Sequence, residues 1–485
     1  MTEIELKLSA AASALPALKA ALEAMGKQSG AAASILISTY YDTPDLKLRQ
    51  HHLTLRVRAQ DGQHVQTVKA DDLTGADFVS RGEWEAAIAG DQPDLDAPET
   101  ARLLKRVVDK DELRPLFRTV IRRTVFELEP QPSARIEAAI DEGDIRGVGD
   151  EALEAISEIE LELKSGDPAA IYDVALRLLD VAPLRIETRS KAERGYSLVA
   201  ADGGTPEAVH VSPITLDAAM TVEDTLQRIG QRCLAHLLRN EPAVLTEQPE
   251  GVHQMRVAVR CLRSMLSALK PMLAGEHYLW TSTELKSLAG VLGAARNWDV
   301  FVVELLEPVE RALPLERNLK RLAEAAEQKR RAAYDSAKQM LLSQEHTAAM
   351  LKLARWLAAR GWRDQPVSER AALLLASIGD VAPGLIERRW RQCRKRSKRF
   401  DELTPDERHK LRIAVKKLRY TIEFLQSLFN EAGVKAFMKL LTPLQEDLGK
   451  INDVRTAHEL VAEAAKDANQ SGGAIALAGG IVLGW

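Results

Sequence analysis

The sequence predicts an α+β protein in which an antiparallel sheet precedes an all-α part. Apolar and polar residues alternate in short segments over residues 1–200, which is the period of a strand. After residue 213, apolar residues recur every three or four positions, which is the period of a helix. The net charge changes sign near the same place: residues 1–203 carry −11 and the remainder carries +7. The two parts are therefore expected to differ in chemistry.

Length and composition indicate a multidomain protein without membrane segments. A chain of 485 residues is too long for one ordinary core, and its start has no secretory signal pattern, so we expect a cytoplasmic protein. The apolar C-terminal stretch GAIALAGGIVLGW is too short to span a bilayer and predicts a core helix. Cys233, Cys261 and Cys393 are far apart in sequence, which indicates neither disulfides nor zinc.

The Gly- and Pro-rich run at 204–213 predicts a linker. We therefore expect a first domain at 1–203 and a helical domain at 214–485. The helical domain divides into two repeats, at about 214–370 and 371–485.

Two strands place several charges on one face. In EIELKL the charged residues are Glu3, Glu5 and Lys7, and in SEIELELK they are Glu158, Glu160, Glu162 and Lys164. A single strand of this kind is commonly an exposed edge. Two with nearly the same sequence favour a site of opposed carboxylates, which suits Mg²⁺ or Mn²⁺ better than zinc.

Other strands of the same part are basic. Arg56 and Arg58 share one face of LTLRVR. In QTVKA, Lys69 points to one face of the strand and Val68 to the other. In IRRTVF, either Arg122 or Arg123 points to the same face of the sheet as these basic residues. On an open sheet these faces would form surface ion pairs. If the sheet closes into a barrel, they surround a polar lumen that fits a polyanion with metal ions.

The segments EIELKL, STYYDTPDLKL, LTLRVR, TVKA, EWE, AIDEGDI, SEIELEL and SKAERGY, in this order, resemble the CYTH superfamily of triphosphate tunnel metalloenzymes. The resemblance covers about residues 1–200. It implies an eight-stranded antiparallel tunnel that hydrolyses, or in some members cyclises, triphosphate compounds with a divalent metal.

The resemblance also implies roles for individual residues. Glu5, Lys7 and Glu160 would be catalytic. Metal ligands would come from Glu3, Glu5, Asp141, Glu158, Glu160 and Glu162, where the second glutamate row has two possible registers, Glu158/Glu160 or Glu160/Glu162. Phosphate contacts would come from Lys7, Arg56, Arg58, Lys69, Arg123, Lys191 and Arg194.

Inorganic triphosphate is the expected substrate, because aromatic residues make up only 5% of the chain and no aromatic cluster in the strands would hold an organic group. Two alternatives stay open. One is a hydrolase or cyclase of organic triphosphates, such as a thiamine triphosphatase or an adenylate cyclase. The other is a non-catalytic polyphosphate-binding protein.

The helical part contains a repeat. HQMRVAVRCLRSML and HKLRIAVKKLRYTI align without gaps at an offset of 156 residues. Each helix carries an apolar stripe and a basic stripe. The basic stripes are His253, Arg256, Arg260 and Arg263 in the first repeat and His409, Arg412, Lys416 and Arg419 in the second.

These helices resemble the CHAD domain over about residues 214–485, which implies binding of inorganic polyphosphate. Asn297 departs from the family pattern, which usually has an acidic residue there, although Asp299 is close. Two basic stripes on facing bundles repel each other unless an anion lies between them, whereas a solvated basic face is the plain alternative. Nucleic acid is not expected as the partner, because the helical part is only +7 and has no nucleic-acid-binding signature, despite the basic run at 388–400.

Overall fold

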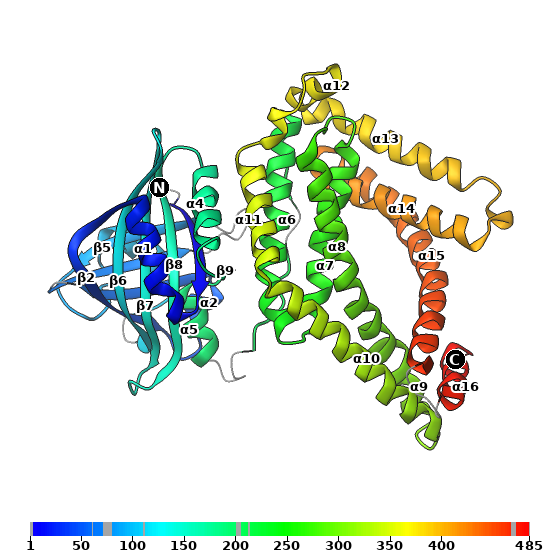
Figure 1. Ribbon diagram of the computed structural model, residues 1–485, viewed down its shortest axis with the longest axis horizontal. Coiled ribbons are helices and arrows are strands. Elements are labelled where there is room, and N and C mark those ends of the chain that lie inside the picture. Colours follow the sequence, from blue (N-terminus) through cyan, green and yellow to red (C-terminus); the bar gives the residue numbers. More distant parts are fainter. Residues whose placement is uncertain are drawn as a thin grey trace. The chain divides into compact units, whose positions relative to one another are not determined.

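The computed structural model of the protein describes residues 3–60, 62–70, 80–109, 112–199, 205–211, 214–466 and 472–484. The chain forms two compact units. One consists of Met1–Pro206 with Leu342–Gly361, and the other of Glu207–Leu341 with Trp362–Trp485. Within the described residues, the strands all lie in the first unit and the second is helical (Figure 1). This confirms the predicted α+β class.

The first unit is built on an antiparallel sheet that closes on itself (Figure 1). The strands follow the order β5-β4-β3-β2-β6-β7-β8-β1, and β1 pairs again with β5, so eight strands form a ring, as predicted. A ninth strand, β9, pairs with β1. Their bounds are β1 Glu3–Ala10, β2 Gly26–Asp42, β3 Leu53–Gln60, β4 Gln63–Ala70, β5 Ser80–Ile88, β6 Arg114–Gln131, β7 Ala134–Gly147, β8 Ala152–Ser165 and β9 Leu184–Glu187.

The barrel has its apolar face outside and its charged face inside. Leu6 and Leu8 of β1 are buried, whereas Glu5 and Lys7 between them line the lumen. Helices pack against the outer face and supply the apolar contacts that a sheet of this polarity needs. They are α1 Leu15–Met25, α2 Lys47–Gln50, α3 Pro98–Leu104 and α4 Ala169–Leu179. Helix α5, Lys191–Val199, instead contacts β6 and β7 and contributes Lys191 and Ala192 to the lining of the lumen.

A helix from the later part of the chain also belongs to the first unit. Helix α11, Gln344–Ala358, packs against α4 and β9, and Arg355 of α11 pairs with Asp173 of α4. Sequence periodicity identifies residues 344–358 as helical. It does not tell which unit the helix joins, because an apolar stripe packs equally well on a sheet-covering helix or in a bundle.

The second unit consists of long helices. Their bounds are α6 Val222–Leu245, α7 Pro249–Leu269, α8 Glu276–Asp299, α9 Glu307–Ala312, α10 Arg317–Leu341, α12 Glu369–Ala372, α13 Ile378–Arg396, α14 Pro405–Leu425, α15 Glu431–Lys466 and α16 Gly472–Gly484.

The apolar stripes of the two repeated helices lie in the core, as predicted. Every member is at most 5% exposed: Met255, Val259, Leu262 and Leu266 on α7, and Leu411, Val415, Leu418 and Ile422 on α14. Burying these faces leaves the basic stripes at the boundary between core and solvent, which is the arrangement that the periodicity implies.

The C-terminal helix α16 is part of a core, as predicted. Ile475, Ala478 and Val482 are buried in one cluster with Leu460 and Val461 of α15. Within the described residues, the helices are all too short or too polar to cross a membrane.

Candidate functional site

The barrel encloses a polar cavity of about 600 Å³. Predicted site residues from six strands and one helix line it: Glu5, Lys7, Arg56, Arg58, Lys69, Arg123, Asp141, Glu160, Glu162 and Lys191. Strand alternation explains this convergence, because one face of every strand of a closed barrel must point inward.

Strands β3 and β4 contribute a basic wall, and β5 next to them contributes Glu83 and Glu85. Arg56 pairs with Glu83 at 3.3 Å, and Lys69 pairs with the same carboxylate at 3.0 Å. Arg58 differs from both, because its guanidinium makes no ion pair within the described residues and donates only to Ser38 Oγ at 3.2 Å. Burial, together with repulsion by Arg56 and Arg123, lowers the pKa of Arg58 to about 10. The wall therefore contains a half-buried cation that has no counter-ion among the described residues.

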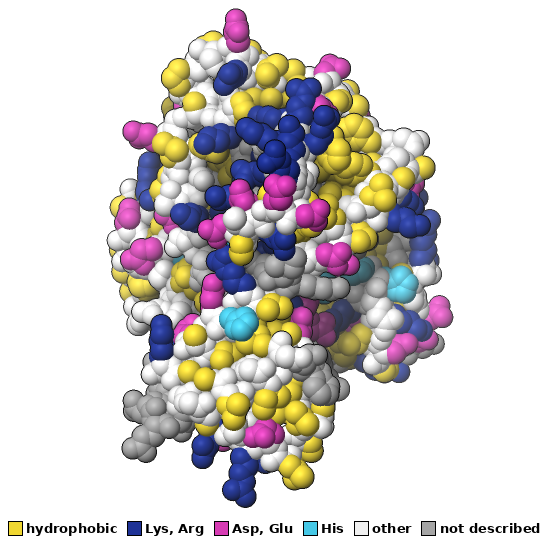
Figure 2. Space-filling view, turned by 90° about the vertical axis from the view of Figure 1, so that its right-hand side faces the viewer, with side chains coloured by type: hydrophobic (Ala, Val, Ile, Leu, Met, Phe, Trp, Pro, Cys, Tyr) yellow, Lys and Arg dark blue, Asp and Glu magenta, His cyan; other side chains and the backbone are white. Residues whose placement is uncertain are grey.

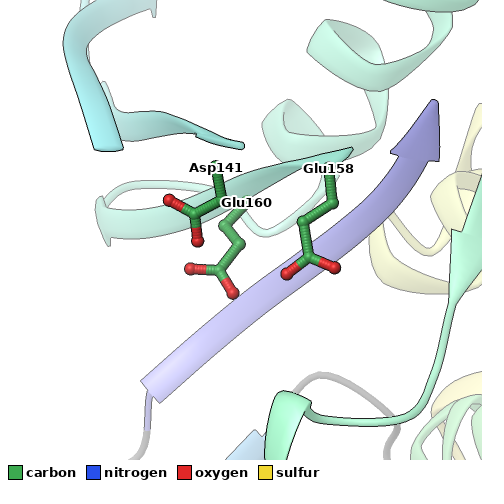
Figure 3. Close-up of side chains that lie close together, drawn as sticks. All are labelled: Asp141, Glu158 and Glu160. Carbon is green, nitrogen blue, oxygen red and sulfur yellow. The ribbon is translucent and has the colours of Figure 1, made fainter. Parts of the chain in front are cut away.

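Three buried carboxylates lie close together on β7 and β8, and two of them, Asp141 and Glu160, line the lumen. Asp141, Glu158 and Glu160 each offer an oxygen within 4.8 Å of the others (Figure 3). Lys191 Nζ donates to Asp141 Oδ2 at 2.6 Å and to Glu160 Oε1 at 2.8 Å, and it also contacts Glu158. Arg123 binds Asp141 in a bidentate pair at 2.7 and 2.6 Å and also contacts Glu160. The cluster thus holds two cations at fixed positions at the edge of the lumen.

Burial and ion pairing act in opposite directions on this cluster. Burial disfavours the charged form of Glu160, but Lys191, Arg123 and Lys7 outweigh it and hold its pKa well below its usual range. The stability that this ionisation contributes is therefore present above the unfolded pKa and is lost only as the pH falls through the lowered value. For Glu158, burial dominates and raises the pKa.

Two predicted residues, Glu158 and Arg194, do not line the lumen. Glu158 is 1% exposed and its second oxygen accepts from Arg194 Nη1 at 3.1 Å. Arg194 also binds Glu154 and the carbonyl of Ala155, so it anchors α5 to β8. Glu3 lies in β1, but its side chain is outside the described residues.

Helix α5 brings Lys191 to the cavity, and two of its residues, Gly195 and Tyr196, fix how the helix packs. A Cβ atom on Gly195 would lie 2.1 Å from the ring of Phe117, so only glycine allows the helix to approach β6 this closely. Tyr196 donates to the buried Asp42 at 3.1 Å, which also accepts from the backbone amides of Thr43 and Leu48. The SKAERGY and STYYDTPDLKL segments are therefore tied together, and this connection fixes the position of α5.

The competition between Arg122 and Arg123 is resolved by the strand. Arg123 lines the cavity, whereas Arg122 is exposed on the outer face of β6 and pairs with Glu142. The two neighbours point to opposite sides of the sheet.

Sequence reasoning missed several lining residues. These are the charged residues Glu83, Glu85, Glu137 and Lys164 and the hydroxyl residues Ser38, Tyr40, Thr54, Thr67, Thr119 and Ser190. The sequence does contain a signal for the glutamates, because EWE and RIEAAID alternate in the same way as EIELKL and SEIELELK. Lys164 stands in the row already identified on β8.

Strand register aligns three lining glutamates across the barrel. Glu5 of β1 is directly opposite Glu162 of β8, and Glu162 is directly opposite Glu137 of β7. Like charges at directly opposed positions destabilise a sheet. Lys164 partly neutralises this row, at 2.6 Å from Glu162 and 3.7 Å from Glu137. Lys7 also contacts Glu5, so the row holds three carboxylates from three strands with two lysines beside them.

In the second unit, the basic stripes of α7 and α14 converge. We call Arg256, Arg260, Arg412 and Lys416 the central cluster. Burial, with repulsion from Arg260 and Arg296, lowers the pKa of Arg256 to about 10. Burial, with repulsion from Arg412 and Arg260, lowers the pKa of Lys416 to about 8.

The environment of the central cluster contains little negative charge. Arg260 stacks over the Tyr420 ring at 4.9 Å, and Arg412 lies 3.8 Å from the exposed Asp453. A Cβ atom on Gly293 would lie 2.8 Å from Arg256 Nη1, so this glycine leaves room for the guanidinium.

The other members of the predicted stripes are placed differently. His253 is half-buried, and its pKa is lowered by burial and by nearby arginines. His409 is also half-buried, Arg263 is exposed, and Arg419 pairs with Glu423 one turn away at 2.7 Å. Asn297 is exposed, and the neighbouring Asp299 cannot replace a carboxylate there, because it is buried and bound by Arg330 and Tyr334.

Comparisons with known proteins find similarity over both parts of the chain. The CYTH domain family matches residues 1–196 and the CHAD domain family matches residues 228–462. The chain is 32% identical to an inorganic triphosphatase of Haemophilus influenzae over 161 residues, which is 33% of this chain and only 45% of that protein. An uncharacterised protein of Mycobacterium tuberculosis is 26% identical over 416 residues, 80% of this chain and 75% of its own. The crystal structure of the CHAD domain from the plant Ricinus communis is 30% identical, with a TM-score of 0.50, over 57% of this chain and 91% of that one.

Proposed function

Because this chain carries a CYTH domain at residues 1–196 and a CHAD domain at residues 228–462, we propose that it joins two activities on phosphate polymers. The barrel hydrolyses inorganic triphosphate to diphosphate and phosphate with a divalent metal. The helical unit binds inorganic polyphosphate. The inorganic triphosphatase of Haemophilus influenzae, which is 32% identical to part of this chain, supports the first activity.

The unpaired Arg58 is the observation that carries the hydrolase proposal. A half-buried guanidinium among other cations and without a carboxylate partner gains from a bound anion, and phosphate oxygens suit its geometry. Arg56 and Lys69 lie on the same wall, so one anion with several phosphates can contact all three. These residues bind and orient the substrate.

The acidic side of the lumen fits a hard divalent cation. Glu5, Glu162 and Glu137 offer only carboxylate oxygens and are forced into one row by strand register. Glu160 lies beside them and also lines the cavity. Oxygen ligands of this kind favour Mg²⁺ or Mn²⁺. When bound, such an ion would polarise phosphate oxygens and lower the pKa of a coordinated water.

Charge balance also favours binding of substrate together with metal. Among the described lining residues, seven carboxylates are matched by seven Lys or Arg side chains. Since the empty cavity is close to neutral, a highly charged triphosphate would bring an excess of negative charge into it. Divalent cations that enter with the substrate remove this excess.

The remaining cations are positioned for the leaving group. Asp141 and Glu160 fix Arg123 and Lys191 at the lumen, and Lys7 contacts Glu5 and lies 4.0 Å from Glu160. Phosphoryl transfer depends mainly on such positioning and charge stabilisation, so a covalent nucleophile is not needed.

The lining favours an inorganic substrate. Among the described lining residues Tyr40 is the aromatic one, and it is 3% exposed because it stacks on Phe117 with ring centroids 4.6 Å apart. A base or a thiazolium ring would find no exposed aromatic face here. The cavity instead offers charged and hydroxyl groups.

Phosphate release from inorganic triphosphate tests the hydrolase proposal. We expect release with Mg²⁺ or Mn²⁺ and none after chelation. Absence of turnover with every divalent metal would leave a non-catalytic polyphosphate-binding protein. Faster turnover of thiamine triphosphate or a nucleoside triphosphate would move the assignment to an organic substrate.

Affinity for long-chain polyphosphate tests the second activity. Replacing both Arg256 and Arg260 by Ala should weaken binding by about 10²-fold, because two cations of the central cluster are removed, and the affinity should fall steeply with salt. The matched control replaces the exposed Lys320 and Arg321 of α10 by Ala. Equal losses in the two double variants would show that the central cluster is only a solvated basic face.

Lys416 gives a prediction for pH. Its pKa of about 8 means that it is largely deprotonated at pH 8.5, and a bound polyanion favours the protonated form. Binding at pH 8.5 should therefore take up about half a proton or more, measured by calorimetry in buffers of different ionisation enthalpy. Lys416→Met should remove this uptake, whereas Lys410→Met, at an exposed position on the same helix, should not. Identical uptake in both variants would contradict the assignment.

A further inference from the structure

The basic face of α7 continues beyond the central cluster. Arg263 and Lys270 are separated by seven residues, so they share one face with Ser267 between them. On α13, Arg389 and Arg396 have the same separation. The two faces meet where Arg389 Nη2 donates to Ser267 Oγ at 2.9 Å, next to a contact from Arg388 to the carbonyl of Ala268.

Lys417 adds a fifth cation from α14, which packs against both α7 and α13. Its pKa is lowered by burial and then by four cations. These four are Arg389, Arg263, Arg396 and Lys270. Arg389 is buried and Lys417 is half-buried, and the other three are exposed on the helices that pack around them. We call this group the distal cluster. Lys416 and Lys417 are neighbours in sequence but point to different clusters, because successive residues of a helix are 100° apart.

The distal cluster lacks negative charge. Within the described residues, none of its five members makes an ion pair with a carboxylate, whereas exposed arginines elsewhere on α13 do, as Arg391 does with Glu387 at 2.6 Å. The Nε atom of Arg389 is buried without a hydrogen-bond partner. Cations near the ends of α7 and α13 gain from the helix dipoles, but this gain is small and does not offset five like charges gathered together.

We propose that the distal cluster is a second anion-binding subsite, which holds the continuation of the polyphosphate chain bound at the central cluster. This inference rests on the proposed function. From Arg256 to Lys270 the two clusters together extend about 21 Å along α7 at 1.5 Å per residue, so only a long chain contacts the full length of both. Figure 2 shows one face of the molecule, on which Lys and Arg side chains gather densely in the upper half.

Linked subsites give a specific dependence on chain length. Once one end of a long chain is held at the central cluster, the rest binds the distal cluster at high effective concentration. A short chain gains nothing from the second cluster. The distal cluster therefore controls the advantage of long chains over short ones.

Binding of short and long polyphosphate to the full-length protein, with metal chelated, tests this inference. Arg263→Gln with Lys417→Gln should weaken binding of long chains by about tenfold or more and change binding of short chains by less than about twofold. Lys320→Gln with Arg321→Gln, which removes the same charges from exposed positions on α10, should change neither. The barrel is intact in all of these proteins, so its own contribution cancels in the comparison. Thermal unfolding of each variant shows whether its fold is retained.

The outcomes separate the two proposals. If the unmodified protein binds no polyphosphate, the proposed function of the helical unit fails, and the subsite with it. If it binds long chains but the Arg263 and Lys417 variant keeps full affinity and length preference, only the second subsite is wrong. A subsite variant that loses short and long chains equally, or single-stranded DNA that competes as well as long polyphosphate, also overturns it.

Discussion

Replacing Glu5 by Gln is expected to lower the turnover of triphosphate by about 10³-fold or more. Glu5 lies in the lumen, directly opposite Glu162, where the carboxylate row concentrates negative charge. The amide keeps the volume of the side chain but removes the charge that attracts a divalent cation. Loss of metal stabilisation worth several kcal/mol corresponds to a rate decrease of this size. The measurement is phosphate release across a range of Mg²⁺ and Mn²⁺ concentrations.

The control for this substitution is Glu23→Gln, because Glu23 is an exposed carboxylate of α1 that pairs with Lys19. Its turnover should be unchanged. In the absence of metal, the unfolding temperature of the Glu5 variant should equal or exceed that of the unmodified protein, since one of three aligned like charges is removed. Metal should also stabilise the variant less than the unmodified protein. A Glu5 variant with turnover near normal at every metal concentration would place Glu5 outside the metal site.

Replacing Arg58 by Gln is expected to lower kcat/KM for triphosphate by about 10²- to 10³-fold without lowering stability. The activity falls because Arg58 is a preorganised cation on the phosphate wall, and loss of one such group costs about this much. Stability should be unchanged or higher, because Arg58 is half-buried, lacks a carboxylate partner within the described residues and is repelled by Arg56 and Arg123. A purely structural arginine would show the opposite result, with stability lost and activity kept.

The matched control is Arg122→Gln. Arg122 lies on the outer face of β6, is exposed and pairs with Glu142, so its loss should leave kcat/KM unchanged and change stability by less than about 1 kcal/mol. Triphosphate without metal should raise the unfolding temperature of the unmodified protein by mass action, and the Arg58 variant should lose most of this shift. An Arg58 variant with normal kcat/KM would remove the observation on which the proposed function depends.

Alternation in the strands, together with the resemblance to the CYTH superfamily, predicted the barrel and most of its lining. A period of two fixes which residues share a face, and charged residues on one face of many strands fit either an open, solvated sheet or the polar interior of a barrel. The order of the resembling segments favoured the barrel. For this reason Glu5, Lys7, Arg56, Arg58, Lys69 and Glu160 could be identified before the structure, although Glu83, Glu85 and Glu137 were overlooked in equally regular segments. The buried faces of the repeated helices could be predicted equally well, because their apolar stripes are buried as the period of 3.6 implies.

The sequence did not predict which side chains of different strands and helices contact one another. Periodicity states which face a residue is on, but register states which residue it opposes, and register depends on turns and packing along the whole sheet. Only the structure places Glu5 opposite Glu162 and Glu137, and only the structure shows that Glu158 and Arg194 bind each other behind the lumen. Likewise, the position of Lys417 beside Arg263 and Arg389 follows from how three helices pack.

The sequence alone therefore determined the two kinds of architecture, the inward charges of the barrel and the basic stripes of the repeat, since these are properties of single elements with a fixed period. The tertiary structure decided which charges neutralise one another and which are left without partners. The pairing of charges depends on distances between elements far apart in the chain. Within the described residues, Arg58 and the distal cluster differ from many other cations because they have no carboxylate partner. A cation that folding brings close to like charges and away from opposite ones gains most from a bound anion, because the anion supplies the missing opposite charge.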